Sequence, residues 1–322
     1  MPLPVQAQLN QWGKEKTPFV FLIDFECLKP KCWKLTGSIN DFAFNFQGFS
    51  NIMPDINKAF LFQENAVKSK TPISFEEYQK KFELVKKEIE YGNSFLVNLT
   101  TATKIETNLS LQDIAQQASS KYICYLKDEF VSFSPETFIR IYNGTITSFP
   151  MKGTIDSSIP NAKDLILNDA KEIAEHATIV DLIRNDLSRV ANNVRVTKYR
   201  YYEEIKTQEG ILGQVSSEIE GALPINYNEI IGDIIFDLLP AGSVSGAPKQ
   251  KTKEIIFKAE QSKRGYYTGI AGYFDGANLD SCVLIRFLQA DNIYRSGGGI
   301  TAQSDVIKEY KEMIDKVYVP AF

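Results

Sequence analysis

Hydrophobic and polar positions alternate in many short runs along the chain, and longer segments with a helical spacing of apolar residues separate these runs. The most specific local signal is Asn143-Gly144, which lies between two alternating runs and suits the positive φ values of a tight hairpin turn. Strands and helices follow one another in mixed order, which predicts an α+β fold. The predicted strands cover residues 19–25, 42–49, 94–100, 122–126, 130–133, 138–149 (a hairpin), 194–196, 212–219, 266–274, 281–288 and 292–296, and the predicted helices cover 74–90, 111–119, 169–189, 227–238, a segment from Pro248 and a last segment capped by Ser304.

The segment 169–189 predicts a helix that is apolar on nearly every side, and such a helix is buried rather than half solvated. Glu172 and Glu175 are three residues apart in it and therefore share one face. A carboxylate in a dry interior usually becomes protonated, pairs with a base or binds a metal. The buried pair therefore predicts a partner elsewhere in the chain.

The last helix supplies a second acidic face, on which Glu309, Glu312 and Lys316 lie together. Two helices that each present paired glutamates would make an oxygen-rich site, which suits Mg²⁺. For the last helix alone, an exposed face with a Glu312–Lys316 salt bridge is the alternative interpretation.

Three further side chains have candidate chemistry. Lys152 follows the predicted hairpin and is either a surface residue or, if desolvated, a base or nucleophile. Glu136 precedes the same hairpin, so we expect it near Lys152, where it could act as a general acid or base. Arg286 lies in an apolar run and therefore needs a planar anionic partner. Together these features predict a site for a small polycarboxylate with Mg²⁺.

The glycine-rich segments 242–246 and 297–299 do not have the spacing of nucleotide-binding fingerprints. Both could offer backbone N–H groups to an anion, and ordinary turn chemistry is the alternative.

Composition excludes several classes of protein. The formal net charge of -4, from 36 basic and 40 acidic residues, leaves no basic footprint for nucleic acid. His176 is the single histidine, which excludes a histidine-rich metal site. The four cysteines have no C-x-x-C spacing, no apolar run approaches the ~20 residues of a membrane span, and the N-terminus lacks the order of a signal peptide. We therefore predict a cytoplasmic protein that acts on neither membranes nor nucleic acid.

No repeat or linker divides the 322 residues, so we predict a single domain over residues 1–322.

Several ordered motifs together resemble the chorismate-utilising enzymes, a family that includes anthranilate, isochorismate, salicylate and aminodeoxychorismate synthases. Within the family, P-M-K-G-T resembles the P-I-K-G-T pattern of aminodeoxychorismate synthase component I, whereas anthranilate synthases have alanine at the position of Lys152. The matching segments are SPE (134–136), PMKGT (150–154), KEIAEHATIVDLIRNDLSRV (171–190), GSVSGAPK (242–249), RGYYTGIAGYFD (264–275), the Arg286 strand and GGGITAQSDVIKEYKE (297–312).

The resemblance implies a mixed two-sheet sandwich with helices outside and an active site between the sheets and the helices. It implies Mg²⁺ on Glu175 and Glu312, with Glu172 and Glu309 close behind. It also implies substrate contacts for chorismate, which involve Arg286, Tyr267, the backbone of Gly297 and Gly299, Ser245, Lys316 and Thr154.

The chemistry implied by the resemblance is the amination of chorismate to 4-amino-4-deoxychorismate, in para-aminobenzoate and folate biosynthesis. Lys152 would add to the ring while the 4-hydroxyl leaves with proton help from Glu136, and ammonia would then displace the lysine. In the family a separate glutamine amidotransferase subunit supplies the ammonia. Another chorismate conversion, such as that of anthranilate synthase, and a non-catalytic chorismate-binding subunit are the alternatives.

Two departures from the family pattern stand out. In GNSFLVNLT (92–100), Leu96 replaces the usual glutamine and Asn93 the usual aspartate, which bears on a polar contact near the reacting ring. The N-terminal region is reduced to about seventy residues, so we do not expect a tryptophan site.

Overall fold

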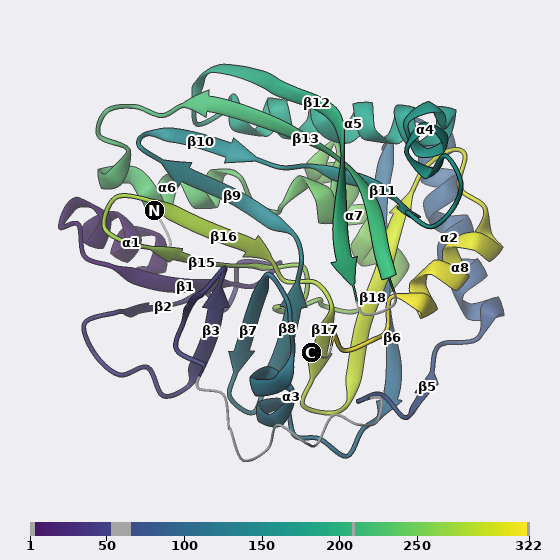
Figure 1. Ribbon diagram of the computed structural model, residues 1–322, viewed down its shortest axis with the longest axis horizontal. Coiled ribbons are helices and arrows are strands. Elements are labelled where there is room, and N and C mark those ends of the chain that lie inside the picture. The colour runs from purple at the N-terminus through teal and green to yellow at the C-terminus, as the bar shows by residue number, and fades with distance from the viewer. Residues whose placement is uncertain (1–3, 53–65, 208–209, 321–322) are drawn as a thin grey trace. The chain divides into compact units, whose positions relative to one another are not determined.

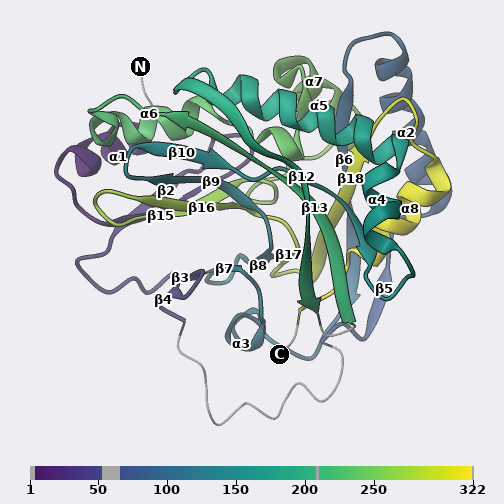
Figure 2. The same ribbon diagram turned by 45° about the horizontal axis from the view of Figure 1, so that its top comes forward.

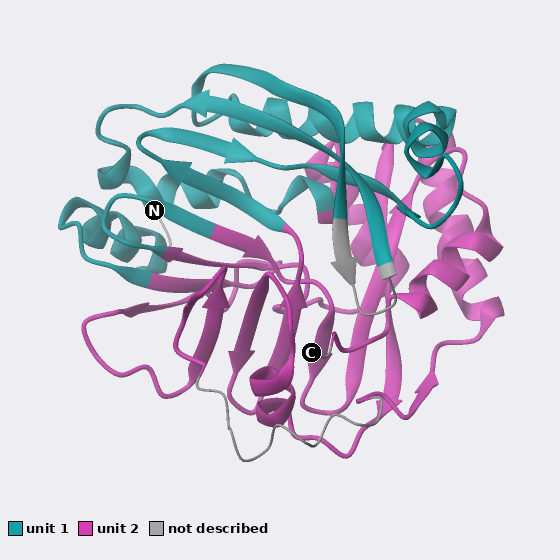
Figure 3. Ribbon diagram, viewed as in Figure 1, with its two compact units in different colours: residues 1–19, 137–243, 274–280 teal, residues 20–136, 244–273, 281–322 magenta. Residues whose placement is uncertain are grey.

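The computed structural model describes residues 4–52, 66–207 and 210–320. The chain comprises two compact units: unit 1 contains residues 1–19, 137–243 and 274–280, and unit 2 contains residues 20–136, 244–273 and 281–322 (Figure 3). The strands form two antiparallel sheets and helices accompany them, which confirms the predicted α+β class. The strands β1 (Phe19–Ile23), β15 (Ile270–Phe274) and β16 (Leu279–Val283) and the 3-10 turn η4 (Gly242–Val244) cross the division between the units, and β2 (Lys31–Lys34) belongs to unit 2.

In unit 1, β11, β13, β10 and β9 are neighbours in that order, and β12 also pairs with β13. The helix α5 contacts β11, β12 and β13, and Figures 1 and 2 both show it along these strands. Unit 1 contains α1 (Pro4–Lys14), β9 (Thr137–Tyr142), β10 (Thr145–Ser148), β11 (Met151–Asp156), α4 (Ala162–Asn168), α5 (Ala170–Leu187), β12 (Asn192–Thr207), β13 (Gly210–Ala222), η3 (Tyr227–Ile230) and α6 (Ile231–Asp237).

In unit 2, the strand order is β14-β6-β18-β17-β8-β7-β3-β4, with β5 on β6. Apolar side chains of α2, α7 and α8 pack with those of β6 and β18 in one buried cluster. Unit 2 contains β3 (Phe42–Phe46), β4 (Phe49–Ser50), β5 (Ser69–Thr71), α2 (Phe75–Glu90), β6 (Leu96–Glu106), α3 (Leu111–Gln117), β7 (Tyr122–Leu126), β8 (Phe130–Ser134), β14 (Gly246–Ala247), α7 (Lys249–Glu260), β17 (Phe287–Gln289), β18 (Ile293–Ile300) and α8 (Val306–Asp315).

The hairpin predicted from Asn143-Gly144 is confirmed. Thr145 pairs with Tyr142 in the antiparallel register of β9 and β10. Asn143 and Gly144 have φ values of 48° and 76°, the left-handed conformation that this turn requires.

The helix α5 differs from its prediction, because it has a solvent-exposed face. Ile173 is 38% exposed, and the alanines at 170, 174 and 177 are also exposed. Alanine counts as apolar in a sequence pattern, but its methyl group gains little from burial. An alanine-rich helix therefore appears more uniformly buried in sequence than it is in the fold.

The predicted strand 281–288 is also different: β16 ends at Val283 and β17 begins at Phe287. Arg286 lies between them with φ 54°, a conformation that interrupts a strand. The glycines 297–299 lie inside β18 rather than in a turn. The last helix is capped by Asp305 instead of Ser304, since the Asp305 side chain accepts from the N–H groups of Ile307 and Lys308.

Candidate active site

A β-bulge in unit 1 directs Lys152 toward α5. Met151 pairs with Ser216 and Thr154 pairs with Gln214, so two residues of β11, Lys152 and Gly153, stand opposite one residue of β13. Such an extra residue bends a strand and re-aims its side chains. The Lys152 ammonium donates to Oε2 of Glu175 over 2.9 Å.

The buried carboxylate of Glu175 forms ion pairs with two lysines, Lys152 and Lys171. Its side chain is 9% exposed, and the ammonium of Lys171 lies 3.6 Å from its second oxygen, Oε1. Oε1 is buried and has no hydrogen-bond partner among the described residues. The ion pairs with Lys152 and Lys171 therefore compensate the buried charge of Glu175.

Glu172 lies beside the same bulge. The N-cap residue Asp169 accepts from the Glu172 N–H, which places Glu172 in the first turn of α5. Gly153 has φ +80°, and a Cβ atom there would lie 2.8 Å from Oε2 of Glu172. Burial raises the pKa of Glu172, and the carboxylate of Glu175 adds to this shift. Both glutamates of α5 therefore face the Lys152-Gly153 bulge.

His176 is buried and neutral. It is 1% exposed, and its Nε2 lies 2.7 Å from Oγ of Ser217. Burial lowers the pKa of His176 to about 4, and the guanidinium of Arg200 contributes to the shift.

A second acidic group lies in unit 2, where α8 packs on β18. A Cβ atom at Gly298 would lie 3.2 Å from Oε2 of Glu309, 3.5 Å from Oε1 of Glu312 and 3.8 Å from Nζ of Lys316. The absence of a side chain at Gly298 therefore lets these three groups converge on the strand. Glu309 is only 5% exposed, and its Oε1 accepts from Oγ of Ser304 over 2.8 Å.

The Glu312–Lys316 salt bridge, the alternative interpretation of this helix face, is also present. Oε1 of Glu312 lies 2.6 Å from the Lys316 ammonium, and the same ammonium donates to the carbonyl oxygen of Gly297 over 2.9 Å. The salt bridge and the acidic group are therefore one arrangement, anchored to the strand that carries Gly297 and Gly299.

In the described part of the chain Arg286 contacts a tyrosine, and the planar anionic partner expected from its sequence position stays a prediction. It is half-buried, its Nε donates to the hydroxyl of Tyr318 over 3.3 Å, and its guanidinium lies 5.4 Å from the centre of that ring. Tyr267 is 4% exposed, and burial raises its pKa to about 12. Among the described residues, the neutral phenol of Tyr318 is the side-chain hydrogen-bond partner of Arg286, so the guanidinium can still bind an anion.

A buried ion pair that no sequence pattern predicted lies against β6 in unit 2. Arg264 and Glu260 are 1% and 2% exposed at the side chain, and their charged groups approach to 2.5 Å. Arg264 also donates to the carbonyl oxygens of Asn98 and Val244, and Glu260 accepts from the N–H and hydroxyl of Thr100. An acidic residue at the end of α7 and a basic residue four positions later were the signal available in the sequence.

This pair supports β6, the strand that pairs with β18. Asn98 and Thr100 of β6 are register partners of Gly299 and Gly297. Ser245 is fully buried, and its carbonyl oxygen accepts from the Asn98 N–H. Four of the predicted substrate contacts in unit 2, Ser245, Gly297, Gly299 and Lys316, therefore belong to one connected hydrogen-bonded region.

The predicted site residues fall in both units. Lys152, Thr154, Glu172 and Glu175 belong to unit 1, where Thr154 is exposed on β11. Glu136 belongs to unit 2, where its N–H donates to Oγ of Ser134. The meeting of Glu175 with Glu312, and of Glu136 with Lys152, stays a prediction.

Carboxylate pairs occur in each unit separately, Glu172 with Glu175 and Glu309 with Glu312. Each acidic helix contributes two glutamates, and carboxylate oxygens are the ligands that Mg²⁺ takes. Within residues 4–52, 66–207 and 210–320, no group of three or more acidic, histidine or cysteine side chains is arranged so that it could hold a metal ion, so the predicted Mg²⁺ site stays a prediction. No helix in this part of the chain has the length and hydropathy to span a membrane.

Comparison with known proteins decides the family. The model of the chorismate binding enzyme family matches residues 47–321. The chain belongs to the chorismate-binding enzymes. An uncharacterized PabA-like protein of Pasteurella multocida is 49% identical over 322 residues, which cover 97% of each chain.

Two further relatives of this chorismate-binding enzyme have named activities. Aminodeoxychorismate synthase component 1 of Klebsiella aerogenes is 33% identical over 263 residues, which cover 76% of this chain and 57% of that protein. The crystal structure of anthranilate synthase component I from Streptococcus pneumoniae superimposes with a TM-score of 0.67 at 27% identity, covering 82% of this chain and 62% of that one. These neighbours confirm the chorismate-utilising fold.

Proposed function

We propose that this enzyme aminates chorismate with ammonia and produces 4-amino-4-deoxychorismate, for para-aminobenzoate and folate synthesis. The observation that carries the proposal is the position of Lys152. The bulge directs the Lys152 ammonium to the carboxylate of Glu175. The Lys152 side chain is 25% exposed. A lysine held in this way is available to a ligand that replaces its ion pair.

The residues divide into three roles under this proposal. Arg286, whose partner among the described residues is the neutral Tyr318, and Lys316 bind the carboxylates of chorismate. Tyr267, Ser245, Thr154 and the backbone of Gly297 and Gly299 complete the substrate contacts. Glu172, Glu175, Glu309 and Glu312 hold Mg²⁺, which orients a substrate carboxylate and neutralises its charge when it is bound.

The reaction divides one difficult displacement into two easier steps. In the first step, Lys152 leaves its ion pair with Glu175 and loses the ammonium proton to water, because its side chain is 25% exposed. The resulting neutral amine forms a bond to the ring, the ring double bonds shift, and the C4–O bond breaks. Glu136, in its protonated form, donates a proton so that the hydroxyl leaves as water. In the second step, ammonia forms the C4–N bond and the electrons return to Lys152, which leaves the ring. The net change is the replacement of a hydroxyl by an amino group, with release of water.

The ammonia comes from a glutamine amidotransferase partner. Amide hydrolysis by a cysteine nucleophile needs a basic histidine beside it. His176 is the single histidine of the chain, and its Nε2 is bonded to Ser217. The single, buried histidine of this chain is consistent with glutamine hydrolysis by a separate subunit.

Incubation with chorismate, MgCl₂ and an ammonium salt, followed by mass spectrometry, tests the proposal. The expected product has an amino group in place of the 4-hydroxyl. Lys152→Ala should abolish its formation while chorismate binding remains measurable by calorimetry. Lys171→Ala is the matched control, since it removes the other ammonium beside Glu175 and should retain turnover. Unchanged amination by Lys152→Ala would exclude the covalent role.

The same assay separates the alternatives. Anthranilate is fluorescent and has lost the pyruvyl side chain, so its appearance would assign the anthranilate synthase reaction. Binding of chorismate without any product, in the presence of Mg²⁺ and ammonia, would assign a non-catalytic subunit.

A further inference from the structure

Lys86 on α2 binds the segment that connects β18 to α8. Its ammonium donates to three carbonyl oxygens of this segment, those of Thr301 (3.5 Å), Ala302 (2.5 Å) and Ser304 (3.2 Å). All of these residues belong to unit 2. Hydrogen bonds from an ammonium are stronger than those from neutral donors. Lys86 therefore fixes the positions of three carbonyl groups in the short segment 301–304.

The segment bound by Lys86 contains Ser304, whose hydroxyl donates a hydrogen bond to the carboxylate of Glu309. The Thr301 N–H donates to Oγ of Ser304 over 3.2 Å, and Oγ of Ser304 donates to Oε1 of Glu309 over 2.8 Å. Ser304 and Glu309 are 6% and 5% exposed, so solvent competes little for these bonds. Because Oε1 is held by Ser304, Oε2 is the oxygen that faces Gly298, beside Glu312.

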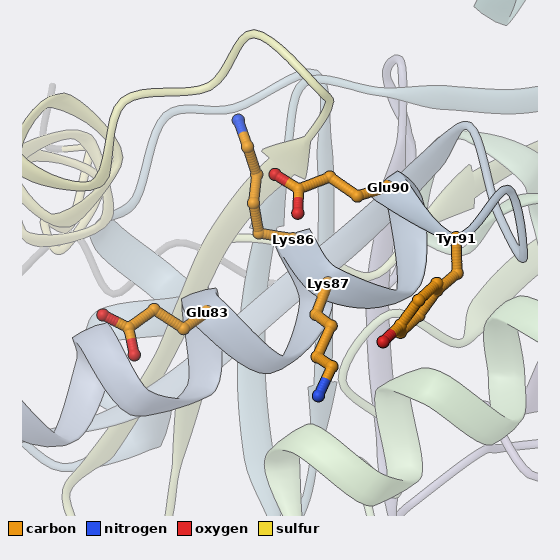
Figure 4. A pocket seen from close by; sticks show the side chains of 5 residues that line it. All are labelled: Glu83, Lys86, Lys87, Glu90 and Tyr91. Atoms are coloured by element: carbon orange, nitrogen blue, oxygen red, sulfur yellow. The ribbon is translucent and has the colours of Figure 1, made fainter.

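The neighbour of Lys86 in the sequence provides a natural comparison. Lys86 and Lys87 both line a hollow of about 510 Å³ on α2, together with Glu83, Glu90 and Tyr91, and they leave the helix in different directions (Figure 4). Lys86 is half-buried, whereas Lys87 is exposed and its ammonium lies 5.8 Å from the centre of the Tyr91 ring. The two lysines therefore carry the same charge on the same helix, but Lys86 contacts residues 301–304 and Lys87 contacts the ring of Tyr91.

We propose that Lys86 is a positioning residue for the acidic group on α8: it holds residues 301–304 so that Ser304 turns Oε2 of Glu309 toward the cation and substrate. This inference rests on the proposed function, because it concerns the same cation. Lys86 itself touches neither ligand. Residues that orient metal ligands from behind usually change metal affinity by 10- to 100-fold when they are removed.

The test measures the affinity of the full-length protein for Mn²⁺, as a probe of the Mg²⁺ site, by electron paramagnetic resonance in the absence of substrate. Lys86→Met should weaken Mn²⁺ binding about 10-fold. Lys87→Met should leave it unchanged, and Lys86→Arg, which keeps the charged donor, should restore most of the affinity. The melting temperatures of the two methionine variants should agree, which separates positioning from general loss of stability.

A double-mutant cycle tests the route through Ser304. Ser304→Ala should weaken Mn²⁺ binding by a similar factor, and the double variant Lys86→Met/Ser304→Ala should be hardly weaker than either single variant. Wild-type affinity in Lys86→Met, additive losses in the cycle, or no binding of Mn²⁺ to the wild type would each overturn the inference. Failure of the proposed function is a separate result: the wild type would bind Mn²⁺ with the dependence on Lys86 described here, but would form no aminated product.

Discussion

The ammonium of Lys152 lies 2.9 Å from Oε2 of Glu175, and this contact joins the candidate nucleophile to a candidate metal ligand within unit 1. The two assignments make opposite demands on one oxygen. While Lys152 occupies Oε2, a divalent cation that binds Glu175 must compete with an ammonium already in place. Cation binding would also release Lys152 from its ion pair toward the substrate.

Lys152→Met is therefore expected to strengthen cation binding in the absence of substrate. Removal of a unit positive charge about 4 Å from a divalent cation contributes on the order of 2 kcal/mol even in a water-like dielectric, or roughly a thirtyfold gain in affinity. Calorimetric titration with Mg²⁺ measures it. Lys171→Met should have a smaller effect, because Lys171 is 3.6 Å from the other oxygen and 40% exposed. Equal or weaker binding by Lys152→Met would argue against competition for Glu175.

Gly153→Ala should impair both stability and cation binding. A side chain at φ +80° is strained by about 1–2 kcal/mol, and its Cβ atom would also lie 2.8 Å from Oε2 of Glu172. Gly144→Ala is the matched control in the same unit, because Gly144 has φ +76° but only a 3.7 Å contact with Tyr227. Urea unfolding should show a loss of stability for both variants, and the loss should be at least as large for Gly153→Ala because of its close contacts. Only Gly153→Ala should change the Mg²⁺ affinity, and equal affinities would show that the bulge does not position Glu172.

Removal of one partner from the buried ion pair in unit 2 should destabilise the protein strongly. Glu260→Gln leaves the guanidinium of Arg264, which is 1% exposed, without its counter-charge, and such changes lower the free energy of unfolding by about 3–5 kcal/mol. Denaturant titration measures this loss. Glu254→Gln, in the exposed pair with Lys251, should lower it by less than about 1 kcal/mol. A comparable loss in the two variants would contradict a structural role for the buried pair.

The two half-buried cysteines should react slowly at neutral pH. Burial raises the pKa of Cys27 and of Cys32 to about 11, and Asp24 contributes to the shift of Cys27. Thiolate, the reactive form, increases as the pH rises toward the pKa. Near pH 8 the native thiols should react with a disulfide reagent about 100-fold more slowly than in urea, since two pKa units separate the folded and ordinary values. Rapid labelling of the native protein would contradict this burial.

Local patterns predicted those features that depend on a few consecutive residues. Asn143-Gly144 specified its hairpin because the conformational preference belongs to these two residues alone. Ser74 likewise starts α2, where its hydroxyl accepts from the N–H of Glu77. Patterns that count apolar residues were weaker guides, since α5 exposes its alanines and Arg286 interrupts a run that appears continuous.

The sequence by itself determined the family, the fold class and the identity of the acidic and basic residues, because these follow from ordered motifs and local periodicity. Only the tertiary structure decided how these residues are used. The bulge that turns Lys152 onto Glu175 depends on the register between β11 and β13, and the orientation of Glu309 depends on a lysine more than two hundred residues away in the chain. Such contacts join distant segments, so their geometry is set by packing and hydrogen bonding between elements and leaves no short-range pattern in the sequence.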